Sequence, residues 1–160
     1  MDNYRIPADW YFLKMAFLAA ERATCVRRKV GCILINSKNH IIATGYNGVA
    51  SGQDHCIDNP CKGADFKSGE GLDVCQAIHA EQNALLQCKD VYDIQSVYCT
   101  VSPCIHCIKL LLNTSATQII FGEKYIDCEV LGNYWMKNKI KGTGTSWSYI
   151  NKNLILGKVN

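Results

Sequence analysis

The chain has 160 residues, of which 48% are hydrophobic and 19% are charged, and its formal net charge at pH 7 is +3. This length and composition are typical of one globular domain with a hydrophobic core, so we expect residues 1–160 to form a single domain. The small net charge does not favour nucleic acid as a stable partner, because such partners usually require a strongly basic surface. It is compatible with a small anionic ligand.

No apolar stretch approaches the roughly 18–20 residues that a membrane-spanning helix needs. The start of the chain, from Met1 to Pro7, lacks the basic and then apolar pattern of a signal peptide. We therefore expect a cytoplasmic protein without a membrane partner. The chain has ten cysteines, and in a reducing compartment cysteines indicate metal ligands or buried thiols rather than disulfides.

The first predicted elements are a helix and a hairpin. Apolar residues recur at helical spacing from about Trp10 to Thr24, and Asp9 is placed to cap this helix. The β-branched and apolar segments 30–36 and 41–46 predict two strands joined by a turn. Their short connection predicts that they pair as a hairpin.

Helices and strands alternate through the rest of the chain. The predicted elements are a helix at 79–88, a strand at 96–101, a helix at 103–114, a strand at 118–122, a helix at 127–137 and a strand at about 147–150. This alternation indicates the α/β class, and we expect a three-layer α/β/α fold with a central mixed sheet. The segment from Asn47 to Val74 is rich in glycine and polar residues, and such long loops are usually functional.

Two short motifs carry the most specific chemical signal. The first is His79-Ala80-Glu81, and the second is Pro103-Cys104-Ile105-His106-Cys107. One histidine and two cysteines supply three zinc ligands, whereas a structural zinc site normally has four and a catalytic site keeps the fourth position for water. Zinc lowers the pKa of a bound water to near neutrality. Glu81 is not needed to hold the metal, and its carboxylate can transfer protons.

The spacing of these residues predicts how the site is built. Cys104 and Cys107 are three residues apart and share one face at the start of a helix, where the helix dipole favours thiolates. His79 and Glu81 are two residues apart and can serve one site only where a helix begins. We therefore expect two helix N-termini to converge on one metal. The alternatives are a structural zinc site with an incidental Glu81, and His106 as a competing ligand.

The same motifs resemble a known family. H-x-E followed by P-C-x-x-C is the signature of zinc deaminases, which hydrolyse an amine from cytosine or adenine. The chain further resembles the deoxycytidylate (dCMP) deaminases of the zinc-dependent cytidine deaminase superfamily, of the phage and bacterial type. The matching segments are 28–31, 42–48, 79–84, 98–100, 102–107 and Tyr125, within about residues 8–128.

The resemblance implies hydrolysis of dCMP to dUMP, which feeds thymidylate synthesis, with Glu81 as the catalytic residue. A phage-encoded member would act in the host cytoplasm. The resemblance also implies that Asn47, Ser102 and Tyr125 bind substrate, with Ser102 and Tyr125 near the phosphate. The alternatives are a core aromatic role for Tyr125 and a left-handed backbone role for Asn47.

Members of this family are typically hexamers that are activated by dCTP and inhibited by dTTP, with Mg²⁺ accompanying the triphosphate. The resemblance assigns effector binding to Arg27, Arg28, Lys29, Gly45, Tyr46, Asn47 and Gly48. Glycines allow close approach to phosphate, and arginine offers bidentate contacts. The alternative is a solvated basic edge.

A second group of cysteines lies outside the catalytic motifs. Phage members carry a second, structural zinc, and the resemblance implies that Cys25, Cys56, Cys61 and Cys75 hold it here. Four thiolates would complete a tetrahedral site and fix the long loop. The alternatives are free thiols, or His55 as one of the ligands.

Two other functions share parts of the pattern. A deaminase acting on tRNA or single-stranded DNA would need a basic groove with stacking aromatics, which the net charge does not favour. A non-catalytic zinc or nucleotide-binding module would have no use for Glu81. The tail after about residue 140 matches no motif.

Overall fold

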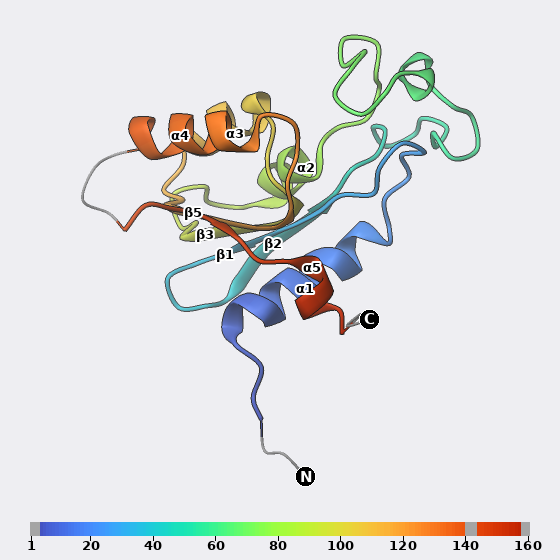
Figure 1. The fold of residues 1–160 in the computed structure, drawn as a ribbon. Coiled ribbons are helices and arrows are strands. Elements are labelled where there is room, and N and C mark those ends of the chain that lie inside the picture. The colour runs from blue at the N-terminus through green and yellow to red at the C-terminus, as the bar shows by residue number, and fades with distance from the viewer. Residues whose placement is uncertain (1–3, 140–143, 158–160) are drawn as a thin grey trace.

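The computed structural model describes residues 4–139 and 144–157 of the chain. They form a central β-sheet with helices on both faces (Figure 1). In chain order the elements are α1 (Ala8–Ala20), β1 (Gly31–Ile35), β2 (Ile41–Tyr46), the 3₁₀ turn η1 (Lys62–Asp65), α2 (Ala80–Gln87), β3 (Ser96–Val101), α3 (Ile105–Leu112), β4 (Gln118–Glu123), α4 (Cys128–Asn138), β5 (Ser146–Tyr149) and α5 (Lys152–Ile155). The expected three-layer α/β/α fold is confirmed.

The sheet is mixed, and its strands follow the order β2-β1-β3-β4-β5. Strand β1 pairs antiparallel with both β2 and β3, whereas β3, β4 and β5 run parallel. The carboxyl ends of β2, β3, β4 and β5 therefore lie at the same edge of the sheet as the start of β1. Segments that are far apart in sequence meet at this edge.

Side chains alternate between the two faces of each strand, as the pleat requires. On β1, Cys32 and Leu34 pack beneath α2, α3 and α4, whereas Ile33 and Ile35 face α1. Every residue of β1 is buried, because helices cover both faces of the sheet. Helix α5 adds Ile155 to the core on the α1 side.

Most predicted elements are confirmed, with three differences at their ends. Helix α1 ends at Ala20 rather than Thr24, because the chain turns at residues 21–22. Asp9 does not cap α1. It lies in the first turn, where its carboxylate accepts a hydrogen bond of 2.7 Å from the Tyr98 hydroxyl. Pro103 precedes α3, because Cys104 is its N-cap residue.

The C-terminal segment contains more structure than the sequence indicated. The predicted strand near its end is confirmed as β5, and the short helix α5 was not expected. The beginning of the tail at residue 140 lies outside the described residues. Within the part of the chain that the structure describes, no helix is long and apolar enough to cross a membrane.

Gly45 sets the distance between strand β2 and helix α2. A methyl group at this position would overlap the carbonyl oxygen of Ala80 and the amide nitrogen of Ala84. The first turn of α2 therefore lies directly on the strand, which fixes the height of His79 and Glu81 above the sheet.

We expect Gly45→Ala to reduce the free energy of unfolding by about 3 kcal/mol or more, because neither backbone can yield cheaply. Urea denaturation monitored by circular dichroism measures this loss. The control is Gly52→Ala, where the added methyl meets nothing within 4 Å and a φ of +86° is the cost. That cost is about 1–2 kcal/mol. A smaller loss for Gly45→Ala than for Gly52→Ala would contradict close packing of α2 on β2.

Candidate active site

Two helix N-termini bring the expected zinc ligands together. His79 is the N-cap residue of α2, Cys104 is the N-cap residue of α3, and Cys107 lies in the first turn of α3. The His79 Nδ1 atom lies 3.4 Å from the sulfur of Cys104 and 3.4 Å from that of Cys107. Zn–N and Zn–S bonds at a tetrahedral angle place these atoms about 3.6 Å apart. The three side chains therefore fit a zinc ion.

The backbone around His79 fixes which way its ring points. The His79 amide donates a hydrogen bond of 2.9 Å to the side-chain oxygen of Gln82. Gln82 is the third residue of α2, so this contact ties the N-cap to the first turn. His106, between the two cysteines, is exposed and is not part of the cluster.

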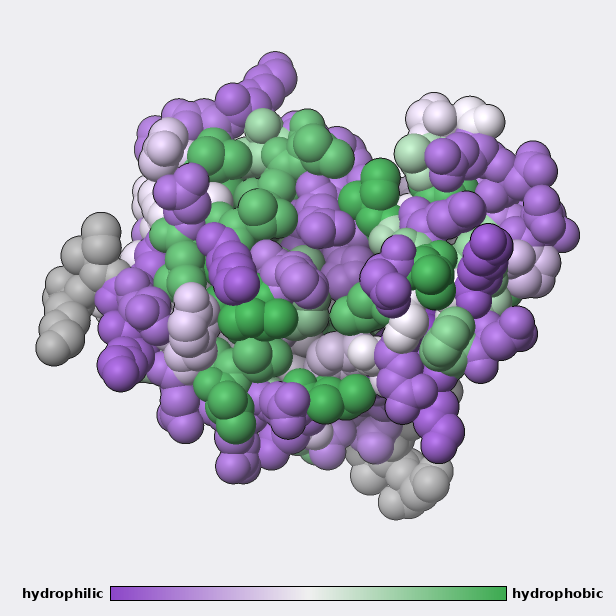
Figure 2. All heavy atoms as spheres, turned by 90° about the horizontal axis from the view of Figure 1, so that it is seen from above, coloured by the Kyte–Doolittle hydropathy of each residue, from purple (hydrophilic) through white to green (hydrophobic). Residues whose placement is uncertain are grey.

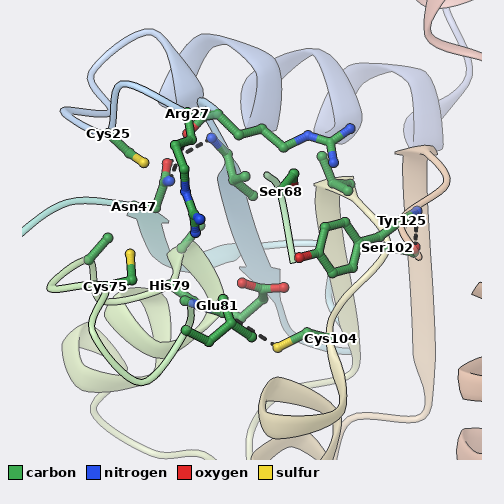
Figure 3. A pocket seen from close by; sticks show the side chains of 16 residues that line it. Cys25, Arg27, Asn47, Ser68, Cys75, His79, Glu81, Ser102, Cys104 and Tyr125 are labelled. Atoms are coloured by element: carbon green, nitrogen blue, oxygen red, sulfur yellow. Dashed lines mark hydrogen bonds between the residues drawn. The ribbon is translucent and has the colours of Figure 1, made fainter. Parts of the chain in front are cut away.

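Glu81 lies beside the cluster as the second residue of α2. It is 4% exposed, and Figure 3 shows its carboxylate directed into the cavity above His79 and Cys104. Burial raises the pKa of Glu81. A carboxyl group with a raised pKa beside a metal site can accept a proton and return it near neutral pH.

The thiols differ in their protonation before a metal binds. A hydrogen bond from Cys107 lowers the pKa of Cys104 to about 3, and His79 adds to this effect. The pKa of Cys107 is raised well above its usual range, because its proton is held by the Cys104 thiolate. The Cys104 hydrogen bond likewise raises the pKa of His79. One sulfur is therefore ready to bind a metal, and the other must first lose a proton.

One pocket extends from this cluster to the start of β1 (Figure 3). Its walls come from the sheet edge, from the starts of α2 and α3, and from the long loop. The lining residues include His79, Glu81, Cys104, Asn47, Ser102, Tyr125, Arg27, Arg28, Ser68 and Leu72. Two of the expected ligands, the expected base and the expected substrate residues thus share one pocket, and Cys107 lies buried behind it.

Ser102 and Tyr125 are joined to each other in the pocket wall. Ser102 is 3% exposed, and its Oγ accepts a hydrogen bond of 2.8 Å from the Tyr125 amide. The hydroxyl proton of Ser102 has no acceptor among the described residues, so it can be donated to a ligand. The Tyr125 side chain is half-buried, and its hydroxyl points into the cavity (Figure 3).

Asn47 supports the backbone at the start of β1. Its Oδ1 accepts from the Val30 amide and its Nδ2 donates to the Arg28 carbonyl, both at 2.8 Å. The alternative of a left-handed backbone at Asn47 is wrong, because its φ is not positive. Its buried amide lines the pocket and fixes the segment that carries the arginines.

The predicted effector residues are divided by the structure. Arg27 and Arg28 line the same pocket as Glu81, whereas Lys29 and Tyr46 are exposed. The glycines serve packing: Gly45 contacts α2, and a methyl at Gly48 would lie 2.5 Å from the Thr24 hydroxyl. Only part of this segment is therefore available for a ligand outside the pocket.

Arg27 holds the long loop against the pocket. Its Nη1 donates to the carbonyl oxygens of Phe66, Lys67 and Glu70 at 3.3, 3.2 and 2.8 Å. Ser68 and Leu72 of the same loop then form one wall of the cavity. The loop, which Figure 2 shows as a lobe beside the helical layer, is thereby part of the site.

The second group of cysteines is close together but is not a compact four-ligand site. The sulfurs of Cys56 and Cys61 lie 3.8 Å apart. The amide of Gln76 lowers the pKa of Cys61, with smaller contributions from the Cys56 and Cys75 thiols. Among the described residues, His79, Cys104 and Cys107 are the only group of potential ligands whose atoms all lie within 4.8 Å of one another.

Cys25 and Cys75 both line the pocket, and Figure 3 shows them at its far end from Cys104. Cys25 follows α1 and does not end it. Burial raises the pKa of Cys75. His55 is exposed. The second zinc site stays a prediction.

Comparison with known proteins identifies the family. The family model described as the cytidine and deoxycytidylate deaminase zinc-binding region matches residues 7–123. The chain belongs to this family. The chain is 36% identical over 128 residues to the deoxycytidylate deaminase of Schizosaccharomyces pombe, covering 78% of this chain and 39% of that protein. The chain thus spans about two fifths of the length of this yeast relative.

A phage relative is closer in length. The deoxycytidylate deaminase of Mycobacterium phage D29 is 36% identical over 124 residues, covering 71% of this chain and 94% of that protein. Among solved structures, the dCMP deaminase of cyanophage S-TIM5, in complex with dCMP and dUMP, matches with a TM-score of 0.67 and 22% identity. The match covers 91% of this chain and 99% of that chain, and it supports the fold.

Several residues of the pocket were not found from the sequence as parts of the active site. Arg27 and Arg28 were assigned to an effector site, and Ser68 and Leu72 lie in a loop without periodicity. The hairpin places the start of β1 beside the end of β2. Only the pairing of β1 with β3 brings the start of β1 close to Ser102, which follows β3. No local signal in the sequence encodes this pairing.

We expect zinc uptake at the cluster of His79, Cys104 and Cys107 to release between about one and two protons at pH 7, measured on metal-free Cys61→Ser protein so that the loop cysteines do not bind a second ion. Zinc needs both sulfurs as thiolates, so the Cys107 proton is displaced, together with any proton on His79. Zinc affinity should therefore rise with pH. Calorimetry in two buffers of different ionisation enthalpy measures this release. Cys128→Ser, a buried cysteine away from the cluster, is the control. Zinc binding without proton release would contradict the assigned protonation of Cys107.

Proposed function

We propose that the protein hydrolyses dCMP to dUMP and ammonia. The observation that carries this proposal is the buried carboxyl of Glu81 beside a three-ligand zinc cluster, in a pocket that also contains two arginines. Family membership supports the deaminase chemistry, and the names of the relatives support dCMP as substrate. In this reading, residues 1–160 act as a single domain.

The mechanism assigns each group at the cluster a separate task. His79, Cys104 and Cys107 would hold the zinc ion. When bound, zinc supplies Lewis-acid activation of a water molecule near neutral pH. Glu81 accepts the proton of the attacking water and delivers it to the pyrimidine ring nitrogen. A second transfer through Glu81 protonates the leaving amine, so dCMP and water become dUMP and ammonia.

The other end of the pocket suits a phosphate. Arg27 and Arg28 supply positive charge, and the Ser102 and Tyr125 hydroxyls can donate hydrogen bonds. A nucleoside without phosphate would make no use of this positive charge. A pocket with a buried carboxyl at its base fits a mononucleotide better than a strand of tRNA or DNA, which needs an extended basic groove. A non-catalytic binding module would not require the buried Glu81.

Regulation and assembly follow from the family resemblance. We infer that dCTP activates and dTTP inhibits the protein, with Mg²⁺ on the triphosphate, and that the dUMP product feeds thymidylate synthesis in the cytoplasm. Because Arg27 and Arg28 lie in the substrate pocket, an effector would use the exposed remainder of that segment, which includes Lys29 and Tyr46.

A hexamer is the assembly that the resemblance implies. Large apolar side chains are exposed on the helical layer that Figure 2 views from above, among them Leu86 on α2, Leu110 on α3 and Val130 on α4. Leu86 is 75% exposed and Val130 is 66% exposed. Exposed apolar groups of this size on one face support subunit contacts.

We also propose the second zinc ion at Cys25, Cys56, Cys61 and Cys75. The short distance between Cys56 and Cys61 supports it, as does the lowered pKa of Cys61. Gly63 supports it too, because a methyl there would lie 2.7 Å from the Cys75 Cα, so these two parts of the loop are in close contact.

Elemental analysis should find about two zinc ions per chain in the wild type. Cys61→Ser should lower this to about one, because the loop site loses a thiolate while the catalytic cluster is unchanged. Cys88→Ser, a cysteine outside both groups, should keep both ions. One zinc per chain in the wild type would remove the second site.

The proposed activity is tested by ammonia release from dCMP, dCTP, deoxycytidine and a tRNA anticodon stem-loop, each with and without added dCTP or dTTP. We expect dCMP to be the preferred substrate, with dCTP raising and dTTP lowering its rate. If dCMP is inert under all conditions while another substrate reacts, the substrate assignment is wrong.

We expect Glu81→Gln to keep the catalytic zinc and to lose deamination. Proton transfer by a positioned side chain contributes about 10²–10⁴-fold, and Glu81 acts in more than one transfer, so the loss should reach at least this size. Ammonia release is measured together with zinc content. Glu129→Gln, an exposed glutamate of α4, is the control. Retained activity in Glu81→Gln would overturn the mechanism.

A further inference from the structure

We propose that Arg28 recognises the 5′-phosphate of the substrate and that Glu123 and Lys152 position it. Lys152 is the first residue of the C-terminal helix α5 and lies beyond the segment that the family model matches. This inference rests on the proposed activity toward dCMP. It assigns a role in substrate recognition to the tail, which no sequence motif explained.

Arg28 has hydrogen-bond donors in the pocket that no described residue accepts from. Its Nη2 lies 3.4 Å from Glu123 Oε2, which is a long contact for a charged pair. No other partner of its guanidinium nitrogens is found among residues 4–139 and 144–157. The guanidinium carbon lies 5.6 Å from the centre of the Tyr125 ring, which keeps it on the pocket side. The remaining nitrogens can form the two parallel hydrogen bonds that a phosphate accepts.

Arg27 is less suited to this task. It also lines the pocket, but its Nη1 is already shared among three carbonyl oxygens of the long loop. Moving Arg27 toward a phosphate would release residues 66–70 and leave those carbonyls without this donor. Arg28 has one long contact, so it can turn toward a ligand without releasing another segment of the chain.

Glu123 divides its carboxylate between two cations. Its Oε2 faces Arg28, and its Oε1 accepts from Lys152 Nζ at 3.1 Å. The shorter contact is with Lys152, so Lys152 competes with Arg28 for the carboxylate. Arg28 is thereby oriented by Glu123 without being fully neutralised. A phosphate entering the pocket competes with a weak ion pair rather than with a strong one.

The sheet topology explains why a residue of the tail reaches this site. Strands β4 and β5 are parallel, so Glu123 at the end of β4 lies beside the chain that leaves β5 toward α5. The Ser102 amide donates to the Glu123 carbonyl at 2.8 Å, which ties the same point to the end of β3. Glu123 therefore joins the pocket wall to α5.

The first test compares dCMP with deoxycytidine, which lacks the phosphate. We expect Arg28→Gln to lower kcat/KM for dCMP by about 10–100-fold, the value of hydrogen bonds to a charged group. The value for deoxycytidine should change by less than about threefold, because the zinc cluster is untouched. Arg22→Gln, an exposed arginine outside the pocket, is the control. Equal losses of kcat/KM for both substrates would overturn the assignment. It would also be overturned if Arg27→Gln, and not Arg28→Gln, lowered kcat/KM for dCMP selectively.

The second test separates positioning from direct contact by a double-mutant cycle. Glu123→Gln should raise KM for dCMP by about 2–5-fold, the size typical of a solvent-accessible ion pair. Glu123→Asp should recover part of this loss. Lys152→Ala should raise KM by a similar factor, because the freed carboxylate then binds Arg28 more strongly and competes with phosphate. In the Glu123→Gln background, Lys152→Ala should have no further effect.

Each outcome of this cycle decides the proposal. A lower KM in Glu123→Gln would show that Glu123 only repels the phosphate. An equal rise in KM from Lys152→Ala in the wild-type and Glu123→Gln backgrounds would show that Lys152 acts independently of Glu123. Either result overturns the positioning roles. Lys124→Ala removes a neighbouring exposed charge and should leave KM unchanged. If the wild type deaminates neither substrate, the proposed function fails, and equilibrium binding of dCMP against deoxycytidine to the same variants then tests Arg28 separately.

Discussion

The active site depends on the meeting of two helix N-termini at one edge of the sheet. A zinc site of this type gathers two thiolates and a carboxylate in a buried place, and such a group of negative charges is costly without compensation. Helices α2 and α3 both present the positive ends of their dipoles there, which favours Cys104 as a thiolate. The metal then completes the compensation. The fold thus supplies the electrostatic environment before any ligand binds.

This arrangement requires accurate placement of α2, because His79 is its N-cap residue and Glu81 is its second residue. The placement comes from direct backbone contact at Gly45 and from the Gln82 side chain that holds the His79 amide. Gly45, which the family resemblance assigned to effector binding, is therefore needed for the packing of α2 on β2. Gly45 affects the site indirectly, because it determines how closely α2, which carries Glu81, approaches the sheet.

The sequence predicted the metal cluster better than it predicted the pocket. Cys104 and Cys107 are local in sequence, and the helix periodicity that places them on one face is readable from their spacing. The boundaries of β2 and β3 were likewise predicted correctly, because apolar and β-branched residues dominate both segments. The position of Arg28 in the pocket was not predicted, because it depends on the antiparallel pairing of β1 with β3. Pairing between distant strands leaves no local trace, so the residues that close the pocket became visible only in the fold.

The mixed sheet also explains how one pocket can bring together the groups that the proposed function assigns to two parts of a nucleotide. Helix α2, before β3, and helix α3, after it, bring the metal ligands, whereas the reversed direction of β1 brings basic residues to the same edge. An all-parallel order would place the start of β1 at the opposite edge, away from Glu81. The antiparallel β1 thus brings Arg27 and Arg28 to the pocket that also contains Glu81 and the metal cluster. The parallel β5 then adds Lys152 from the tail, so helix α5 lies at the same edge of the sheet as His79 and Glu81.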